Sequence, residues 1–138
     1  MSSGLTVSPD FTIRSLETPE EFDSYFRLNA QTFRPDEDTA LVAARRRRFI
    51  MGDPDFQVSH LHGAFLGEVH VGSYRMQERW LYVGSSRVRV GCIGGVVTRP
   101  EYRHQGIASA LMLDALTLAR QHHYGLFLLP ATGVCGCI

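Results

Sequence analysis

The stretch Arg103-His104-Gln105-Gly106-Ile107-Ala108 decides the fold, because it joins a strand-like run to a long apolar helix. The run before it, Cys92-Ile93-Gly94-Gly95-Val96-Val97-Thr98, has two adjacent glycines, which mark a bulge or the close approach of a ligand or another backbone. After it, Ile107 to His122 has apolar residues at helical spacing, and Gly125 to Leu129 reads as a buried strand. Strand, loop, helix and strand predict a βαβ unit with parallel strands and a right-handed crossover.

The start of this helix is a candidate anion site. The first backbone N–H groups of a helix have no partner within it, and the helix dipole places partial positive charge there. Gly106 has no side chain to obstruct a phosphate. A glycine at a helix start is a weak signal when taken alone, because many helices begin near a glycine for packing reasons.

Upstream, the pattern predicts one strand and two helices. Phe11 to Leu16 suggests the strand. Thr18-Pro19-Glu20-Glu21 supplies an N-cap, a proline in the first turn and a capping-box glutamate for the first helix. Arg34-Pro35-Asp36 ends that helix, and the second helix begins at Asp36 to Asp38 and ends at Met51.

Between Phe56 and Thr98 the pattern becomes that of an antiparallel meander. Its expected strands are Gln57 to His62, Val69 to Val71, Arg79 to Val83 and Arg87 to Val90. The meander leads directly into the glycine-containing run. The sequence therefore predicts an α/β domain in which antiparallel strands precede the parallel pair.

Composition excludes several kinds of chemistry. The 138 residues suit one domain, and 14 basic residues balance 14 acidic ones, so binding of nucleic acid or membranes by net charge is not expected. Every basic residue is arginine, which excludes lysine-dependent phosphate loops, Schiff bases and Ser-Lys dyads. The first nine residues do not resemble a secretion signal, and the longest uncharged stretch is too short for a membrane span, so a cytoplasmic location is expected.

The only charge block is Arg45-Arg46-Arg47-Arg48, within the second expected helix. Successive residues lie about 100° apart on a helix, so the four cations fan around it and form no flat anion-binding patch. They are interpreted as cations near a helix C-terminus, and the alternative is that one of them reaches a substrate or coenzyme phosphate.

The stretch from Arg103 to Ala108 resembles the Arg/Gln-x-x-Gly-x-Gly/Ala signature of the GCN5-related N-acetyltransferases, the GNAT superfamily. Residues Gly94 to Arg103 look especially like the Eis-type branch. The resemblance implies an α/β fold whose mixed, mostly antiparallel sheet has helices on both faces. It covers residues 11–129, after a flexible N-terminus at 1–10 and before an atypical tail at 130–138.

The resemblance also implies a site for acetyl-CoA as co-substrate, without a metal. The backbone of Val96, Val97 and Thr98 is expected to bind the pantetheine arm. The residues expected around the pyrophosphate are Arg103, His104, Gln105, Gly106, Ile107, Ala108 and Ser109. Two alternatives stay open: Arg103 is a solvated loop cation, or Gly94-Gly95 is a packing bulge without a ligand.

The implied reaction is direct attack of a primary amine, from a small molecule or a peptide, on the thioester. The amine must first lose a proton, and the candidate bases are His60, His62, Glu68 and His70. His60 and His62 are expected on one strand face, with His70 across a hairpin. Ordinary partly exposed histidines are the alternative to a base, and no spacing motif supports a zinc site.

The end of the chain departs from the family pattern. Members often have a tyrosine, after the strand matching Gly125 to Leu129, that protonates the CoA thiolate, but no tyrosine follows Leu129 here. The C-terminus is therefore expected to be incomplete, and the catalytic residues stay unassigned. Two alternatives to an active N-acetyltransferase are a non-catalytic acyl-CoA-binding module, or inactive fragment, and a homo-oligomer in which another chain completes the sheet.

Overall fold

The computed structural model describes residues 11–124 and 126–128. The expected segments 1–10 and 130–138 lie outside this part of the chain. The described elements, in chain order, are β1 (Phe11–Ser15), α1 (Pro19–Phe33), α2 (Thr39–Met51), the 3-10 helix η1 (Val58–His60), β2 (Leu61–Leu66), β3 (Val69–Val83), β4 (Ser86–Thr98), the 3-10 helix η2 (Pro100–Tyr102), α3 (Ile107–Gln121) and β5 (Leu126–Leu128).

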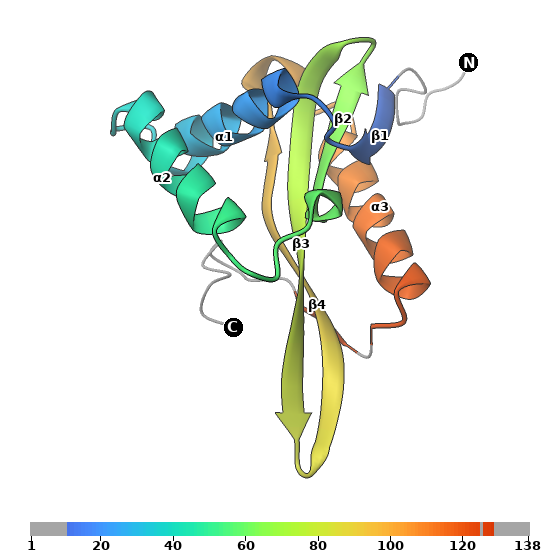
Figure 1. Cartoon of the computed structure of the whole chain (residues 1–138). Coiled ribbons are helices and arrows are strands. Elements are labelled where there is room, and N and C mark those ends of the chain that lie inside the picture. The colour runs from blue at the N-terminus through green and yellow to red at the C-terminus, as the bar shows by residue number, and fades with distance from the viewer. Residues whose placement is uncertain (1–10, 125, 129–138) are drawn as a thin grey trace, which may run out of the picture.

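The strands form one sheet in the order β1-β2-β3-β4-β5. Neighbours from β1 to β4 are antiparallel, and β5 pairs with β4 in parallel. Helices α1 and α2 lie on one face of the sheet and α3 on the other (Figure 1). The mixed, mostly antiparallel sheet with helices on both faces is therefore confirmed, as is the parallel pairing of the strands that flank α3.

Each face of the sheet has its own hydrophobic core. Alternate side chains of a strand point to opposite faces, so Tyr74 and Ile93 pack toward α3 with Leu111, while Phe65 packs toward α1 with Phe26. All five are at most 2% exposed, and burying a side chain of this size contributes about 1.5–3 kcal/mol. The buried residues of α3 thus hold the helix against the sheet along its length and fix the position of its first turn.

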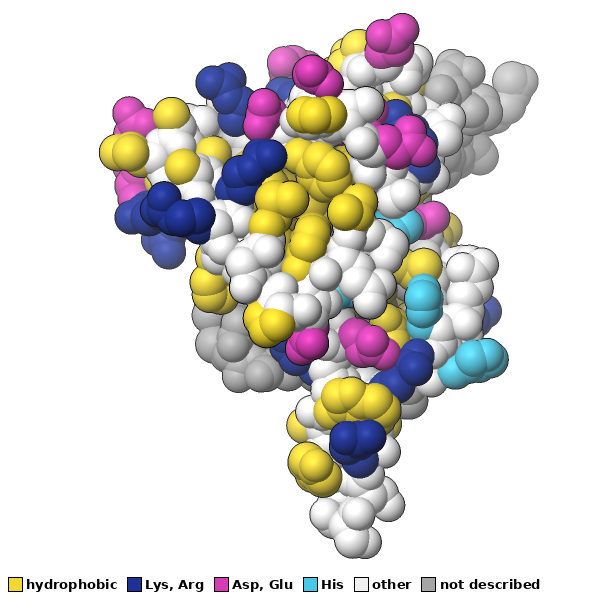
Figure 2. Space-filling view, viewed as in Figure 1, with side chains coloured by type: hydrophobic (Ala, Val, Ile, Leu, Met, Phe, Trp, Pro, Cys, Tyr) yellow, Lys and Arg dark blue, Asp and Glu magenta, His cyan; other side chains and the backbone are white. Residues whose placement is uncertain are grey.

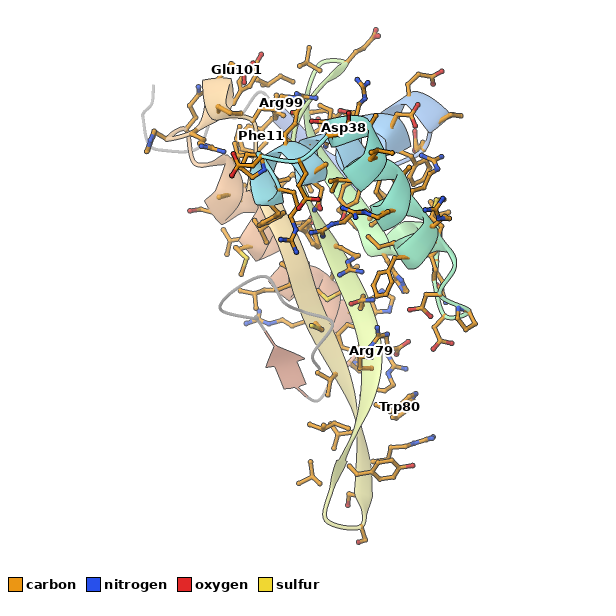
Figure 3. All side chains as sticks on the ribbon, turned by 90° about the vertical axis from the view of Figure 1, so that its left-hand side faces the viewer. Phe11, Asp38, Arg79, Trp80, Arg99 and Glu101 are labelled. Carbon is orange, nitrogen blue, oxygen red and sulfur yellow. The ribbon has the colours of Figure 1, made fainter. Side chains whose placement is uncertain are left out.

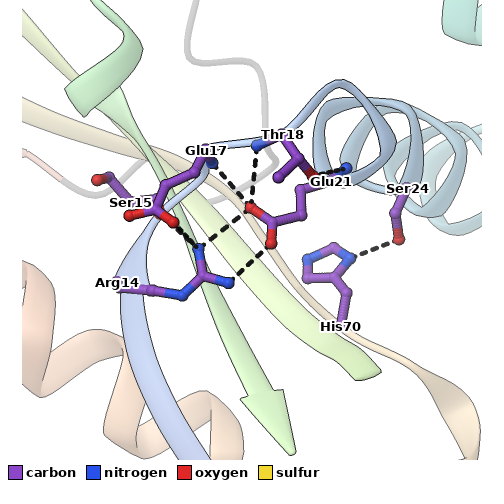
Figure 4. A network of polar contacts seen from close by, with 7 residues as sticks. All are labelled: Arg14, Ser15, Glu17, Thr18, Glu21, Ser24 and His70. Carbon is purple, nitrogen blue, oxygen red and sulfur yellow. Dashed lines mark hydrogen bonds and ion pairs between the residues drawn. The ribbon is translucent and has the colours of Figure 1, made fainter. Parts of the chain in front are cut away.

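The capping box at the start of α1 is confirmed. The Glu21 N–H donates to Thr18 Oγ1 at 3.1 Å, and the Thr18 N–H donates to Glu21 Oε1 at 3.3 Å. The Arg14 guanidinium of β1 donates two hydrogen bonds to the same carboxylate, of 3.1 and 2.7 Å (Figure 4). Hydrogen bonding from Arg14, assisted by the Glu17 and Thr18 amides, lowers the pKa of Glu21 to about 2 against the raising effect of burial. This cluster fastens α1 to the edge of the sheet.

The arginines of α2 spread around the helix, as the sequence predicts. Arg45 pairs with Glu37 at 2.9 Å, and Arg47 pairs with Asp23 of α1 at 3.1 Å. Figure 2 shows dark-blue side chains gathered over α2 on the left of the molecule. Two of the four cations are thus engaged with carboxylates of the chain itself.

Two expected details are wrong, and a third is confirmed with longer strands. The strands expected on either side of Gly84 are present within β3 and β4, whose ends form a hairpin that projects beyond the core (Figure 1). The segment Val58–His60, expected as strand, is instead a 3-10 helix. His122, expected on the apolar face of α3, is exposed because the helix ends at Gln121. No described helix is long and apolar enough to cross a membrane.

The projecting hairpin has large apolar side chains at its surface. Trp80 and Tyr82 are 50% and 71% exposed, and the Arg87 guanidinium lies 4.0 Å from the centre of the Trp80 ring. Arg87 and Arg89 lie on one face of the ribbon with these aromatics, and Val88 lies on the other, because residues paired across a ladder share a face. The Trp80 and Arg87 side chains therefore pack on each other outside the two hydrophobic cores.

Candidate functional site

The glycine pair in β4 breaks the regularity of the strand. Gly95 has φ +61°, which disfavours any other residue, and the pairing of β3 with β4 shifts register between Ser73 and Arg75. A Cβ atom at Gly95 would lie 3.0 Å from Asn29 Nδ2 of α1. The expected bulge is present, and the missing side chain lets α1 approach the strand closely. We call Gly94 and Gly95 the glycine break.

Beyond the glycine break, one edge of β4 is unpaired within the described part of the chain. β5 pairs only with Val90–Cys92, which leaves Ile93–Thr98 without a neighbour on that side. The Arg99 N–H donates to the Val71 carbonyl of β3 at 2.8 Å, so the backbone groups of Val97 also point to β3. Those of Val96 and Thr98 point to the free edge. Only these two of the three predicted strand residues can therefore bind a ligand there through the backbone.

The loop after β4 leads to unpartnered amides. Gly106 is the N-cap of α3 with φ 83° and offers no side-chain cap. The first backbone hydrogen bond into the helix runs from the Ala110 N–H to the Gly106 carbonyl, so the N–H groups of Ile107, Ala108 and Ser109 have no acceptor among the described residues. His104 also has positive φ, 66°, which turns the loop sharply. These groups have the geometry that favours an anion.

The remaining predicted loop residues surround the same helix start. Arg103, His104 and Gln105 are exposed, whereas the Ile107 side chain is 2% exposed and anchors the first turn in the core. The Arg103 guanidinium donates from Nε to the Thr98 carbonyl at 3.2 Å. The loop and the free edge of β4 are therefore adjacent. Figure 3 shows Arg99 and Glu101 where β4 ends, at the opposite end of the sheet from Trp80.

The predicted bases do not gather at one place. His70 is 6% exposed and faces α1, where its Nδ1 lies 2.7 Å from Ser24 Oγ (Figure 4). Arg99 donates to Ser24 Oγ at 2.9 Å and to the His70 carbonyl at 2.6 Å. The Ser24 hydroxyl therefore lies between the Arg99 guanidinium and the His70 ring and is hydrogen-bonded to both. Burial, and next Arg99, lower the pKa of His70 to about 4.

His62 lies on the opposite face of the sheet from His70. Its ring stacks on Tyr74 at 5.1 Å, and its Nδ1 is 3.3 Å from Asp114 Oδ2 of α3. The Tyr74 hydroxyl donates to the same carboxylate at 2.7 Å. Burial acts to raise the pKa of Asp114, but His62 and Tyr74 lower it on balance.

The expected sharing of one strand face by His60 and His62 is wrong, because His60 lies in η1. Its Nδ1 accepts the Gln57 N–H at 3.3 Å, and burial lowers its pKa. Glu68 is exposed in the turn between β2 and β3. No group of three or more His, Cys, Asp or Glu side chains within the described ranges is placed to hold a metal ion.

Sequence reasoning missed several polar residues around β4. Ser24 and Arg99 lie 75 positions apart and meet only through packing of α1 on the sheet. Asn29 could have been found from the sequence. It follows Tyr25 by four positions, which places an amide on the apolar face of the first helix. Arg75 lies within the long β3, where no expected strand was placed.

A family model described as an acetyltransferase (GNAT) domain matches residues 12–134. The chain belongs to the GNAT acetyltransferase family. Among curated proteins, none matches it. The family assignment makes this chain an acyltransferase domain, as the resemblance of Arg103 to Ala108 implies.

Solved structures agree with this assignment. A transcriptional regulator from Bacillus halodurans has a TM-score of 0.69 at 24% identity, covering 88% of this chain and 81% of its own. A GCN5-related N-acetyltransferase from Kribbella flavida has a TM-score of 0.65 at 27% identity, covering 93% of this chain and 32% of its own. The GNAT fold of the chain is thus shared with proteins of very different length.

Eis1 from Mycobacterium abscessus also has this fold, with a TM-score of 0.65 at 20% identity. The match covers 83% of this chain and 26% of Eis1. Identity at this level shows the fold alone, so the expected Eis-like branch stays a prediction. This GNAT chain spans about a quarter of Eis1 and about a third of the Kribbella protein.

Proposed function

We propose that this GNAT domain transfers the acetyl group of acetyl-CoA to a primary amine by direct attack. The observation that carries the proposal is the free edge of β4 beside the unpartnered amides of α3. The strand edge can bind an extended chain through backbone hydrogen bonds, and the helix start can bind an anion. Acetyl-CoA has a diphosphate joined to an extended arm with amide groups, so its diphosphate fits the helix start and its arm fits the strand edge.

In this proposal, the pantetheine arm lies along β4 and bonds to the backbone of Val96 and Thr98, with Val97 packed behind them. The diphosphate lies at the start of α3. The loop and helix residues around it are Arg103, His104, Gln105, Gly106, Ile107, Ala108 and Ser109. Backbone N–H groups supply most of the donors, so no lysine is required. The thioester end then reaches the glycine break.

The proposed reaction conserves atoms and charge. The amine nitrogen attacks the thioester carbonyl carbon, a C–N bond forms, the C–S bond breaks and CoA leaves as a thiolate. A proton leaves the nitrogen and a proton ends on the thiolate. Holding both reactants in place lowers the barrier by up to about 7–11 kcal/mol.

The base stays unassigned. An alkyl ammonium has a pKa of about 10.4, so deprotonation needs an acceptor. His62 is paired with Asp114 on the opposite face of the sheet, and Nδ1 of the buried His70 is hydrogen-bonded to Ser24. His60 borders a pocket, but its Nδ1 accepts the Gln57 N–H. These contacts favour transfer through solvent over a histidine base.

Titration calorimetry with acetyl-CoA tests the proposed site. We expect Gly106→Val to weaken binding by about tenfold or more, because the new side chain obstructs the anion and strains a residue at φ 83°. Gly84→Val is the matched control, since Gly84 has φ +64° and open space around it in the hairpin turn. Equal affinity of wild type and Gly106→Val contradicts the diphosphate placement.

Release of CoA thiol with a panel of amines separates the two classes of function. Binding with amine-dependent release supports the transferase. Binding alone supports the acyl-CoA-binding module. If neither binding nor release is seen, assembly with a second copy becomes the explanation. A cytoplasmic location and a homo-oligomer stay predictions.

A further inference from the structure

On the face of the sheet covered by α1, polar side chains converge on the glycine break. Tyr25 and Asn29 are 1% and 2% exposed. A Cβ atom at Gly95 would lie 3.7 Å from the Tyr25 hydroxyl and 3.0 Å from Asn29 Nδ2. Asn29 Oδ1 is buried and has no hydrogen-bond donor among the described residues. A buried amide oxygen of this kind costs about 1–3 kcal/mol when it stays unpaired.

The third group is Arg75 of β3, directly opposite Gly94 in the ladder. No carboxylate in the described part of the chain lies within 4.0 Å of its guanidinium, although Asp53 comes within 3.7 Å of the nearby Arg79. In the orientation that satisfies its neighbours, the Gln77 amide oxygen accepts from Arg75 at 3.2 Å. Within the described residues the guanidinium therefore forms no ion pair, although Asp53 and Asp55 line the same pocket.

The electrostatics of Arg75 agree with this geometry. Burial lowers its pKa, and the neighbouring cations Arg46 and Arg79 lower it further. Tyr25 and Asp53 act in the opposite direction without offsetting them. An arginine in such surroundings gains more from a bound anion than a surface arginine does, because the charge is less screened by water.

Arg75 is accessible from outside through a pocket between α2, η1 and β3. Its polar lining consists of His60, Arg75, Gln77 and Arg79 together with Asp53 and Asp55, and its apolar lining consists of Ile50 and Phe56. Figure 3 shows Arg79, which lines this pocket, on β3 next to Trp80 of the projecting hairpin. The pocket has a volume of about 10 Å³, room for roughly one water molecule, and it reaches the guanidinium on the strand next to the glycine break.

We propose that the acceptor is a primary amine that also carries a carboxylate, which Arg75 binds while Asn29 and Tyr25 hold the amine beside the glycine break. The inference rests on the proposed function, because that function places the thioester at this break. A planar guanidinium matches a carboxylate with two parallel hydrogen bonds. The amine N–H supplies the donor that Asn29 Oδ1 lacks, and burial keeps the Tyr25 hydroxyl protonated by raising its pKa.

The juxtaposition also limits the size of the acceptor. Residues directly opposite in an antiparallel ladder have Cα atoms about 4.5–5.5 Å apart. Arg75 and Gly94 are such a pair, so the Arg75 side chain begins beside the glycine break. The proposed acceptor is a free amino acid, whose amine and carboxylate are only a few bonds apart, because the pocket that reaches Arg75 is small.

The test compares each amino acid of a panel with its own carboxamide as acceptor, by initial rates of CoA release. The two compounds share every atom except those of the acid group. We expect kcat/KM to favour the acids by about tenfold or more. The amine of a carboxamide is the weaker base and loses its proton more easily, so this preference cannot come from deprotonation. Equal kcat/KM for both series overturns the inference.

Variants of Arg75 locate the effect. Arg75→Gln is expected to raise KM for the acids by about tenfold, with KM for the carboxamides and the Kd of acetyl-CoA unchanged. Arg75→Lys keeps the charge and is expected to restore part of the preference. Arg87→Gln, an exposed arginine of the hairpin, is the matched control. An unaltered preference in Arg75→Gln, with its thermal unfolding like that of wild type, overturns the assignment.

A readout without turnover keeps this inference separate from the proposed function. Thermal unfolding with CoA present is measured with N-acetyl amino acids and with their carboxamides. Stabilisation by the acids alone, lost in Arg75→Gln, supports the anion site even where transfer is slow. Equal effects of the two series overturn it. Failure of acetyl-CoA to bind wild-type protein contradicts the proposed function instead.

Discussion

Arg14 and Glu21 form a two-bonded ion pair that closes the start of α1 against β1. The same Glu21 carboxylate accepts the amides of Glu17 and Thr18, so a single charge joins a strand, a turn and a helix. Since α1 covers the glycine break at its other end, this pair also contributes to the position of Asn29.

Replacing Glu21 by Gln is expected to lower the free energy of unfolding by about 1–2 kcal/mol, through loss of part of the cap and of the ion pair. The control is Glu17→Gln, because Glu17 is 67% exposed and lies 3.6 Å from Arg14, so we expect a change within about 0.5 kcal/mol. Urea unfolding followed by far-ultraviolet circular dichroism measures both. A larger loss in Glu17→Gln contradicts the assignment.

The Glu21 contribution is also expected to depend on pH. Its folded-state pKa, about 2, lies below the ordinary value of 4.5. The stabilisation is therefore complete above pH 4.5 and is lost as the pH falls from there toward 2. In Glu21→Gln this part of the pH profile should be flatter than in wild type.

His70 acts in a separate pH range. Its folded-state pKa is about 4, below the ordinary value of 6.5, so the unfolded chain binds the proton first. Stability is expected to fall as pH drops from 6.5 toward 4, by at most about 3 kcal/mol. His70→Asn should flatten the profile between pH 6.5 and 4.5, where Glu21 does not titrate. The exposed His122→Asn is the control, and equal profiles for wild type and His70→Asn rule out this role.

Gly95→Ala is expected to destabilise the chain more than Gly67→Ala does. Both glycines have positive φ, +61° and +60°, so the backbone strain of about 1 kcal/mol is similar. Only Gly95 has a close neighbour, Asn29 Nδ2 at 3.0 Å, whereas nothing lies within 4 Å of a Cβ atom at Gly67. Removing that neighbour in Gly95→Ala/Asn29→Ala should make the two changes less than additive in circular dichroism melts. If the free-energy changes of the two single variants add up exactly in the double variant, α1 moves aside for the new methyl group without loss of stability.

Arg103→Ala is expected to change the Kd of acetyl-CoA by about threefold or less, well below the effect of Gly106→Val. The reason is that the proposed diphosphate site is built from backbone amides, while the Arg103 side chain is exposed and donates to Thr98. Calorimetry at two salt concentrations measures both variants. A loss in Arg103→Ala as large as that in Gly106→Val would make the side chain the main anion ligand.

The elements predicted well are those that local rules determine. The N-cap at Thr18, the end of α2 at Gly52 and the start of α3 after Gly106 each depend on a few neighbouring residues, and all three are found. The η1 helix was missed because Gln57 to His62 alternates like a strand, whereas β1 has pairing partners only from His62 to Leu66.

The candidate site was predictable only in part, for the same reason. The β4 edge and the α3 amides come from one continuous stretch, so the signature locates them. The polar cluster at the glycine break joins Asn29, Arg75 and Gly95 from three elements, and only tertiary packing brings them together. The direction of the Val97 backbone depends on the pairing with β3, which no sequence pattern specifies.

Trp80 is the only tryptophan in the chain, and it lies half-exposed on the projecting hairpin beneath Arg87. Its emission therefore reports the hairpin and not the two cores. Fraying of this ribbon would change the fluorescence spectrum while the helices stay intact, so a fluorescence melt and a dichroism melt of this domain should not coincide. The indole is a ready-made optical probe for anything that docks on the hairpin.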